Sequence, residues 1–313
     1  MNHLPNNSGI VNLGGTNDIS NNNLGNGTQT NNHGTPPSTP DPSTTEVEVT
    51  GAPEESRRNW DVGVVTILPK EMRAVTEGLG LEARRKVDGL FFSTGEVSTD
   101  AGSVSVVATQ THSPGQRSVM SALDHLRRHF SPRLWILVGI GGGLHREHAR
   151  IGNVIVSTRV VYYDSRKIRA GGDVQPRGEE RQAPARVVHA VNVYFTDRGE
   201  PAMIRGQRDG HRKRTFEVHP GLIGSGEAVV ADGDSDVHRF LKGYNDKVLA
   251  VDMESGGLSQ YWQENSVGGE PNPDWVVVRG ISDNADEEKN DDSHDLAAGN
   301  AAHVVRELLP YLC

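Results

Sequence analysis

The chain has 313 residues, of which 35% are hydrophobic and 23% charged, and its formal net charge is −9 at pH 7. Nucleic acids are bound through clusters of Lys and Arg, so this acidic balance argues against a nucleic-acid partner. The single cysteine, Cys313, excludes a disulfide framework and a cysteine-based metal site. Because the sequence shows no signal peptide and no apolar run of about 18 residues, we expect a cytoplasmic protein without a membrane span.

Residues 1–58 differ in composition from everything that follows. They are rich in Asn, Gly, Thr, Ser and Pro and nearly free of aromatic residues. Such a segment buries too little apolar surface to offset the entropy lost on ordering. We therefore predict a disordered tail over residues 1–58 and one folded domain over residues 59–313. A short apolar stretch at residues 9–15 leaves open a protein partner that binds the tail.

In the folded part, strand and helix patterns alternate along the chain. In chain order they predict a strand at 62–66, a helix at 69–79, strands at 90–92 and 104–109, a helix at 114–129, strands at 134–138 and 154–161, a helix at 183–195, strand-like runs at 222–223 and 228–230, a helix at 236–241, a strand at 248–251, a helix at 254–263, a strand at 275–279 and a helix at 292–309. The basic stretch at 198–214 is typical of a solvated loop. This alternation predicts a single three-layer α/β/α domain with a mixed, mostly parallel central sheet.

Four of the apolar runs stop abruptly at a glycine or a carboxylate. The runs at 62–66, 134–138, 248–251 and 275–279 lead to Glu71, the glycine segment 139–143, Glu254 and Asp283. Groups just past the carboxyl ends of parallel strands collect in one crevice, so these side chains should converge. Three carboxylates beside a closely approached backbone suggest acid/base chemistry on a small molecule, with no metal and no cofactor.

Each carboxylate also has a plain structural interpretation. Burial at a strand end would raise the pKa of Asp283 and make it a general acid, although a loop or N-cap aspartate fits equally well. Glu254 could accept hydrogen bonds from a vicinal diol, and Glu71 could polarise a water; both could instead be first-turn glutamates favoured by the helix dipole. Residues 139–143 lack the spacing of a dinucleotide or P-loop motif, and the sequence contains no HExxH or GxSxG motif.

Two longer motifs carry a family resemblance that covers about residues 60–311. They read Val-Asp-Met-Glu-Ser at 251–255 and Val-Val-Val-Arg-Gly-Ile-Ser-Asp-Asn-Ala-Asp at 276–286. In order and spacing they resemble the purine nucleoside phosphorylase/nucleosidase superfamily, most closely its 5'-methylthioadenosine/S-adenosylhomocysteine nucleosidase branch. The resemblance implies hydrolysis of the N-glycosidic bond of adenine nucleosides of the methylthioadenosine/adenosylhomocysteine type by a homodimer.

The resemblance also implies a role for each site residue. Glu71 would activate water and Asp283 would protonate N7 of the purine. Glu254 would hold the ribose hydroxyls while Met253 packs on the sugar. Gly141, Gly142, Ser282 and Val229 would complete the substrate pocket, with Val229 where an aromatic residue often stacks on adenine. Ile140 stands where these nucleosidases usually have a serine.

Three other functions stay open. One is an adenine-nucleotide (AMP/ATP) nucleosidase acting as a defence effector, with phosphates held by Arg159, Arg166, Lys167 or Arg169. Another is a phosphorolytic nucleoside phosphorylase. The third is a catalytically silent nucleotide-binding sensor, against which the intact trio Glu71, Glu254 and Asp283 argues.

Overall fold

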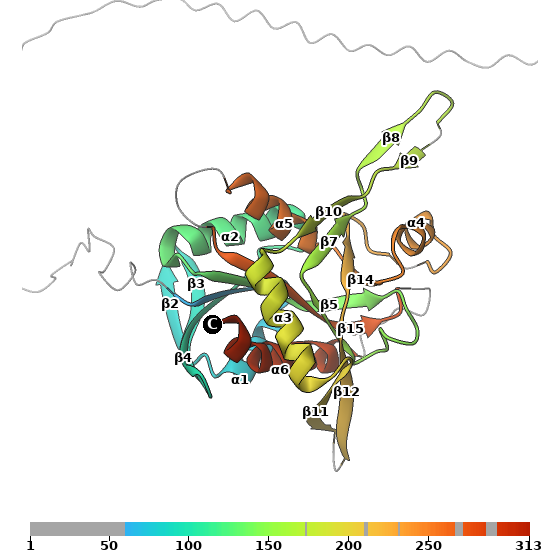
Figure 1. Ribbon diagram of the computed structural model, residues 1–313. Helices are drawn as coiled ribbons and strands as arrows, with labels where there is room; N and C mark the ends of the chain where they lie inside the picture. Colours follow the sequence, from blue (N-terminus) through green and yellow to red (C-terminus); the bar gives the residue numbers. More distant parts are fainter. Residues whose placement is uncertain (1–59, 173, 210–211, 231, 267–271, 286–292) are drawn as a thin grey trace, which may run out of the picture. The chain divides into compact units, whose positions relative to one another are not determined.

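The computed structural model describes residues 60–313, with gaps at 173, 210–211, 231, 267–271 and 286–292 (Figure 1). The predicted tail at 1–58 lies outside the described residues. No helix within the described part is long and apolar enough to cross a bilayer.

Thirteen strands form one mixed sheet, whose main path runs β10–β7–β13–β14–β5–β1–β4–β3–β2. The strands of the domain are β1 (Val62–Thr66), β2 (Ala83–Val87), β3 (Leu90–Thr99), β4 (Gly102–Gln110), β5 (Leu134–Gly143), β6 (Val154–Ser157), β7 (Arg159–Tyr162), β8 (Arg166–Ile168), β9 (Val174–Pro176), β10 (Glu179–Gln182), β11 (Ala202–Asp209), β12 (Arg212–Pro220), β13 (Leu222–Ser225), β14 (Val248–Asp252) and β15 (Asp274–Asp283). β8 and β9 pair only with each other, as a separate two-stranded ribbon.

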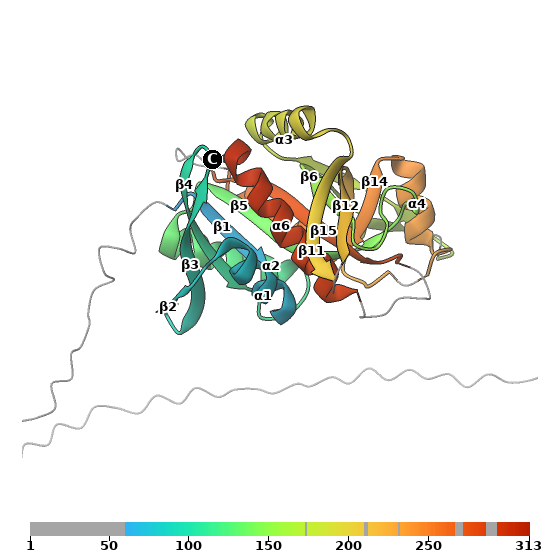
Figure 2. The same cartoon turned by 90° about the horizontal axis from the view of Figure 1, so that it is seen from below.

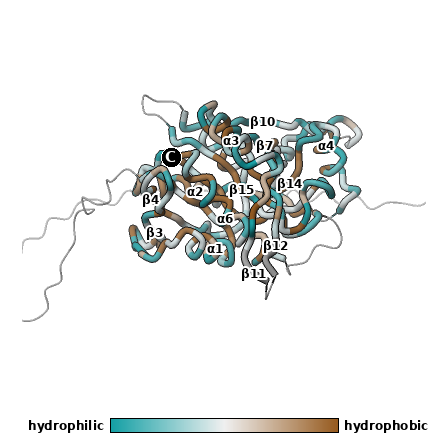
Figure 3. The backbone as a smooth tube through the Cα atoms, turned by 60° about the horizontal axis from the view of Figure 1, so that its bottom comes forward, coloured by the Kyte–Doolittle hydropathy of each residue, from teal (hydrophilic) through white to brown (hydrophobic). Residues whose placement is uncertain are grey.

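The central strands are buried on both faces, which explains why they read as unbroken apolar runs. β5 pairs in parallel with β1 and with β15, and every residue of β1 is buried. Strands covered by helices on both faces need no polar alternation. The hydropathy-coloured trace shows the same pattern, with apolar residues concentrated along β15 and the inner helix turns (Figure 3).

Helices cover the two faces of the sheet and complete the predicted three layers (Figures 1 and 2). They are α1 (Pro69–Leu79), α2 (Gln116–Phe130), α3 (Ala185–Arg198), α4 (Asp236–Tyr244), α5 (Ser255–Glu264) and α6 (His294–Leu312). α6 packs against α1, α3 and the strands β5 and β15, whereas α2 packs against α5 and β1. The predicted fold class is therefore confirmed.

One difference from the predicted elements bears directly on the site. The glycine segment at 139–143 is not a turn, because β5 continues through Gly143 and β15 continues alongside it to Asp283. The far end of this extension then pairs antiparallel with β14, with Ala250 opposite Gly143. The convergence predicted for a parallel sheet is correct, but it arises where two extended strands meet a third that runs the opposite way.

Other predicted elements were wrong in detail. The run at 154–161 is two strands, β6 and β7, and residues 228–230 are not in a strand. The stretch at 198–214 is not simply a solvated loop: it contains the end of α3 and most of a hairpin, β11 with β12, that pairs with β6. Ala202 and Ile204 of this stretch are buried, as are Phe216 and Val218 just beyond it, and the density of arginines between them hid these strands.

Candidate active site

A cavity of about 160 Å³ lies where β1, β5, β14 and β15 end. All eight predicted site residues line it: Glu71, Gly141, Gly142, Val229, Met253, Glu254, Ser282 and Asp283. The structure thus brings these eight residues together in one cavity.

Glu71 is held by backbone N–H groups at the start of α1. Its Oε2 accepts hydrogen bonds from the amides of Ile67 (2.8 Å) and Leu68 (2.7 Å), and its Oε1 accepts one from Ile140 (2.8 Å). Pro69 occupies the first helical turn, where its missing N–H costs nothing. Since each carboxylate oxygen can accept about two hydrogen bonds, Oε1 of Glu71 keeps an acceptor site for a ligand or water.

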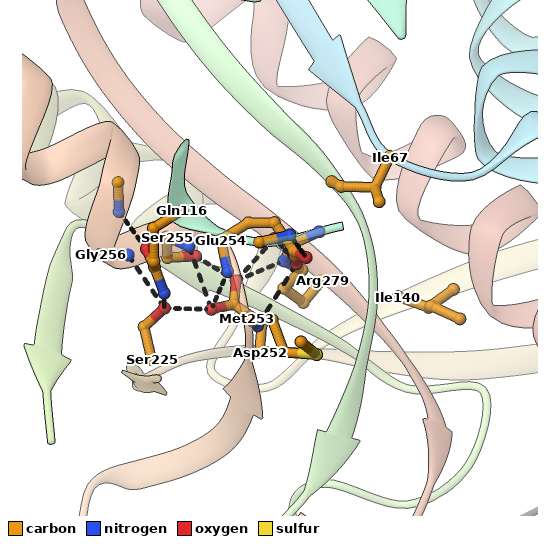
Figure 4. A network of polar contacts seen from close by, with 12 residues as sticks. Ile67, Gln116, Ile140, Ser225, Asp252, Met253, Glu254, Ser255, Gly256 and Arg279 are labelled. Atoms are coloured by element: carbon orange, nitrogen blue, oxygen red, sulfur yellow. Dashed lines mark hydrogen bonds and ion pairs between the residues drawn. The ribbon is translucent and has the colours of Figure 1, made fainter. Parts of the chain in front are cut away.

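A fully buried ion pair lies beside Glu71. Arg279, in the middle of β15, is 0% exposed and donates from Nε (2.8 Å) and Nη2 (2.6 Å) to Oδ2 of Asp252. Asp252 also accepts hydrogen bonds from Ser225 and Ser255 (Figure 4). Burial by itself raises the pKa of Asp252, but the guanidinium of Arg279 and these hydrogen bonds hold it below its usual value. We therefore treat Asp252 as ionised.

Glu254 shares the same guanidinium but is less well compensated. Its Oε2 lies 3.2 Å from Nη2 of Arg279, and its Oε1 accepts a hydrogen bond from the Gly115 amide (3.0 Å). Burial raises the pKa of Glu254 to about 7, and although Arg279 opposes this shift, the neighbouring charge of Asp252 adds to it. Near neutral pH Glu254 can therefore either accept a hydrogen bond from a hydroxyl group or donate one to it. We call Glu71, Asp252, Glu254 and Arg279 the floor of the cavity.

Gly139 is the position where two floor side chains approach the backbone. A Cβ atom there would lie 2.4 Å from Nη1 of Arg279 and 2.5 Å from Oε1 of Glu71. Only glycine leaves room for both groups. Nη1 of Arg279 is buried and has no hydrogen-bond partner among the described residues. The ends of both side chains are therefore packed against the backbone at Gly139.

Val229, Ser282 and Asp283 also line the cavity, and we call these three residues the base end. Asp283 is buried, and its Oδ2 accepts a hydrogen bond from the Ser282 hydroxyl (2.8 Å) while Oδ1 accepts one from the Ala285 amide (2.9 Å). A Cβ on Gly142 would lie 3.1 Å from Oδ1 of Asp283. Val229, by contrast, is 57% exposed.

Sequence reasoning missed Arg279 and Asp252 as parts of the site. A signal for Arg279 was present: a single charged residue inside an otherwise apolar buried strand must be paired with an acid. Asp252 gave a weaker one, since it directly precedes the Met-Glu pair. His294, the first residue of α6, also lines the cavity and was not predicted.

The four basic residues proposed to hold phosphates do not line this cavity. Arg159 pairs with Glu180, Arg166 with Asp164, and Arg169 donates to Gln175. These interactions are made on β7 and the β8–β9 ribbon. That one of them holds a phosphate of a nucleotide substrate stays a prediction, although none of them lines this cavity.

The fold and the arrangement of this cavity define a known class of protein. A family model described as the phosphorylase superfamily matches residues 61–310, and the chain belongs to that superfamily. Among curated relatives, the ATP nucleosidase Cap17 of Escherichia coli is 27% identical over 264 residues, 79% of this chain and 50% of the relative. The chain thus spans half the length of that relative. The 5'-methylthioadenosine/S-adenosylhomocysteine nucleosidase of Mycobacterium tuberculosis is 26% identical over 274 residues, 80% of this chain and 97% of the relative.

Solved structures show the same fold. A 5'-methylthioadenosine/S-adenosylhomocysteine nucleosidase from Neisseria meningitidis, in complex with methylthio-immucillin-A, matches with a TM-score of 0.60 and 22% identity over 80% of this chain and 98% of that chain. The futalosine hydrolase of Helicobacter pylori matches with a TM-score of 0.60 and 17% identity over 80% and 97% of the two chains.

Proposed function

We propose that this protein hydrolyses the N-glycosidic bond of adenine nucleosides and releases free adenine. The observation that carries the proposal is the meeting of Glu71, Glu254 and Asp283 in one cavity, with an acceptor site left on Oε1 of Glu71. A water bound at that acceptor site would be placed to attack a sugar carbon held over the floor.

The reaction divides among three side chains as follows. As the bond between C1' and N9 breaks, its electron pair moves into the purine, and Asp283 gives a proton to N7. The oxygen of the bound water forms the new bond to C1', and its proton passes to Glu71. Glu254 holds the ribose hydroxyls while positive charge develops on the sugar ring, which the surrounding carboxylates stabilise.

Hydrolysis is preferred to phosphorolysis on electrostatic grounds. Among the described residues that line the cavity, Glu71, Asp252, Glu254 and Asp283 are acids, and none is Lys or Arg. Arg279 lies behind them and is already engaged by Asp252 and Glu254. A phosphate dianion placed beneath C1' would meet these carboxylates at close range, whereas a water would not.

The names of the relatives support adenine as the base but differ in the group carried at C5'. One relative is named for methylthioadenosine and adenosylhomocysteine and another for ATP. We propose the methylthioadenosine/adenosylhomocysteine type and the adenine nucleotides as the two candidate substrate classes. We also propose a cytoplasmic homodimer, as the family resemblance implies; light scattering on the purified chain measures the oligomeric state.

The decisive experiment identifies the sugar product. Adenosine, methylthioadenosine, AMP and ATP are each incubated with the protein in ¹⁸O-labelled water, with and without inorganic phosphate, and the products are analysed by mass spectrometry. We expect free adenine and a free ribosyl product with one ¹⁸O at C1', at a rate that phosphate does not increase. Ribose 1-phosphate as the main product would place the protein among the phosphorylases instead.

A further inference from the structure

The cavity has a third part, which the proposed reaction does not use. If the purine lies at the base end and the ribose over the floor, the 5' substituent can lie against Ile67, Leu68, Pro114 and His294, which also line the cavity. We call Leu68, Pro114 and His294, together with Lys70, the rim. The following inference rests on the proposed function, because that function sets the orientation of the substrate.

The rim carries a Lys–His pair. Nζ of Lys70 lies 3.3 Å from Nδ1 of His294, joining the first turn of α1 to the first residue of α6. His294 is 8% exposed and lines the cavity, and Lys70 is half-buried beside it. A lysine that lies beside a cavity and uses one donor on the ring nitrogen of His294 keeps donors for a further acceptor, because an ammonium group has three.

The backbone adds to the positive character of the rim. α1 and α6 pack against each other and both begin at this rim. The amides before α1 are taken by the carboxylate of Glu71, so it is the start of α6 that lies beside the cavity and the ammonium group and favours an anion there.

A second hollow extends this positive region. A groove of about 630 Å³ lies across the Leu68–Pro69 peptide from the cavity, between α1 and strands β2 to β4. Its titratable lining residues among the described residues are Arg73, Arg84 and His112, with no acid. In a chain with a net charge of −9, a groove lined only by basic titratable groups beside a carboxylate-lined cavity is a marked separation of charge.

We propose that the rim binds a phosphate group at C5', so that the substrate is a 5'-phosphorylated adenine nucleoside rather than a thioether nucleoside. Lys70 donates to the first phosphate, and His294 positions Lys70. A methylthio group would leave this donor unused, whereas a phosphate matches the rim in charge and stands away from the carboxylates of the floor.

The test compares the specificity for AMP with that for adenosine and methylthioadenosine. For the full-length protein we expect kcat/KM to be highest for AMP or ATP. Lys70→Gln should lower the ratio of kcat/KM for AMP to that for adenosine by about 10–100-fold, the range of a charge-assisted hydrogen bond, mainly through KM. Lys70→Arg, which keeps the charge, should restore most of the ratio. Arg128→Gln, an exposed arginine on α2 outside both hollows, is the matched control and should leave the ratio unchanged.

Each outcome decides one question. Preference for methylthioadenosine by the wild-type protein would show that the rim does not bind a 5'-phosphate. An unchanged ratio of kcat/KM for AMP to that for adenosine in Lys70→Gln would show the same. Stimulation by inorganic phosphate with consumption of that phosphate would show a co-substrate site, and the proposal would be wrong. If no substrate releases adenine, the proposed function fails; calorimetry then measures AMP against adenosine binding, and only tighter AMP binding that Lys70→Gln abolishes supports the rim.

Discussion

The floor and the rim of the cavity are built in different ways. Arg279, at the floor, is fully buried and makes several hydrogen bonds, and Glu71 accepts three from backbone amides. At the rim, Lys70 is only half-buried, and its ammonium group lies 3.3 Å from Nδ1 of His294. The floor groups are thus enclosed by the protein, whereas the lysine of the rim is partly open to solvent.

This difference suggests a division of labour. Groups that act in the transition state must be held within a fraction of an ångström, and a dense hydrogen-bond network achieves this. Groups that select one 5' substituent over another need only a difference in affinity. Changes at the floor and the base end should therefore lower kcat for every substrate, and changes at the rim should alter the ratio between substrates.

The largest effect is expected for Asp283→Asn. The amide keeps the size of the side chain but cannot give a proton to the base, so kcat for adenine substrates should fall by about 10²–10⁴-fold. A nitrophenyl riboside, whose leaving group needs no proton, should be largely spared if the cavity admits it. Initial rates of adenine and nitrophenol release measure both.

Asp88→Asn is the matched control for that substitution, because Asp88 is exposed, lies between β2 and β3 and does not line the cavity. Equal slowing of both substrates by Asp283→Asn, or no slowing of either, would refute the general-acid assignment. Either result would mean that the base end takes no part in the chemistry. The distinction between groups that act in the reaction and groups that select the substrate would then lose support.

Gly139→Ala tests how tightly the floor is held. The added methyl would collide with Arg279 and Glu71, so one of them must move. We expect a loss of about 1–3 kcal/mol in the free energy of unfolding and a fall in kcat of about 10–100-fold. Gly299→Ala on α6 is the control, because its new Cβ meets nothing within 4 Å and should be neutral or slightly stabilising. Equal behaviour of the two variants would mean that the floor tolerates displacement.

The pH dependence of stability tests the charge balance of the floor. The pKa of Glu254 in the folded protein is about 7, above its ordinary value of 4.5. A raised pKa means that ionising this group opposes folding, so its contribution is favourable below about pH 4.5 and is lost as pH rises through 7. Relative to Glu254→Gln, the wild type should therefore lose about 1–3 kcal/mol of unfolding free energy between pH 5 and 8.5.

Urea unfolding of both proteins across that pH range measures the difference. Glu77→Gln, at an exposed position on α1, is the control and should follow the wild type at every pH. A constant gap between wild type and Glu254→Gln would mean that Arg279 compensates Glu254 fully.

The strand ends explain why so much of the site could be predicted from the sequence. Glu71, Glu254 and Asp283 each follow or close an apolar run, and a sheet brings such positions together whatever the details of its pairing. The fold class followed from the same alternation of strands and helices. Both inferences depend on local patterns that a single sequence contains.

What could not be predicted depends on contacts between distant segments. Residues 139–143 look like a turn because they are mostly glycine, yet they form strand, since β15 and β14 supply partners for their backbone groups. The pairing of Lys70 with His294 joins residues 224 positions apart, and no local pattern marks it. Likewise, Arg166 and Lys167 lie on the β8–β9 ribbon, whose direction the sequence does not specify.

The smallest effect should come from the groove beyond the rim. If phosphates after the first extend toward Arg73 and Arg84, then Arg73→Gln should lower kcat/KM for ATP relative to AMP by only about 2–5-fold, because exposed charges are screened by solvent and salt. The effect should shrink as salt rises from 50 to about 300 mM. Arg128→Gln removes an equal charge elsewhere and should leave the ATP-to-AMP ratio unchanged. An equal loss for ATP and AMP would place Arg73 among the ligands of the first phosphate and extend the rim into the groove. No loss for either would mean that substrate selectivity rests on Lys70 and His294 and that the groove takes no part in it.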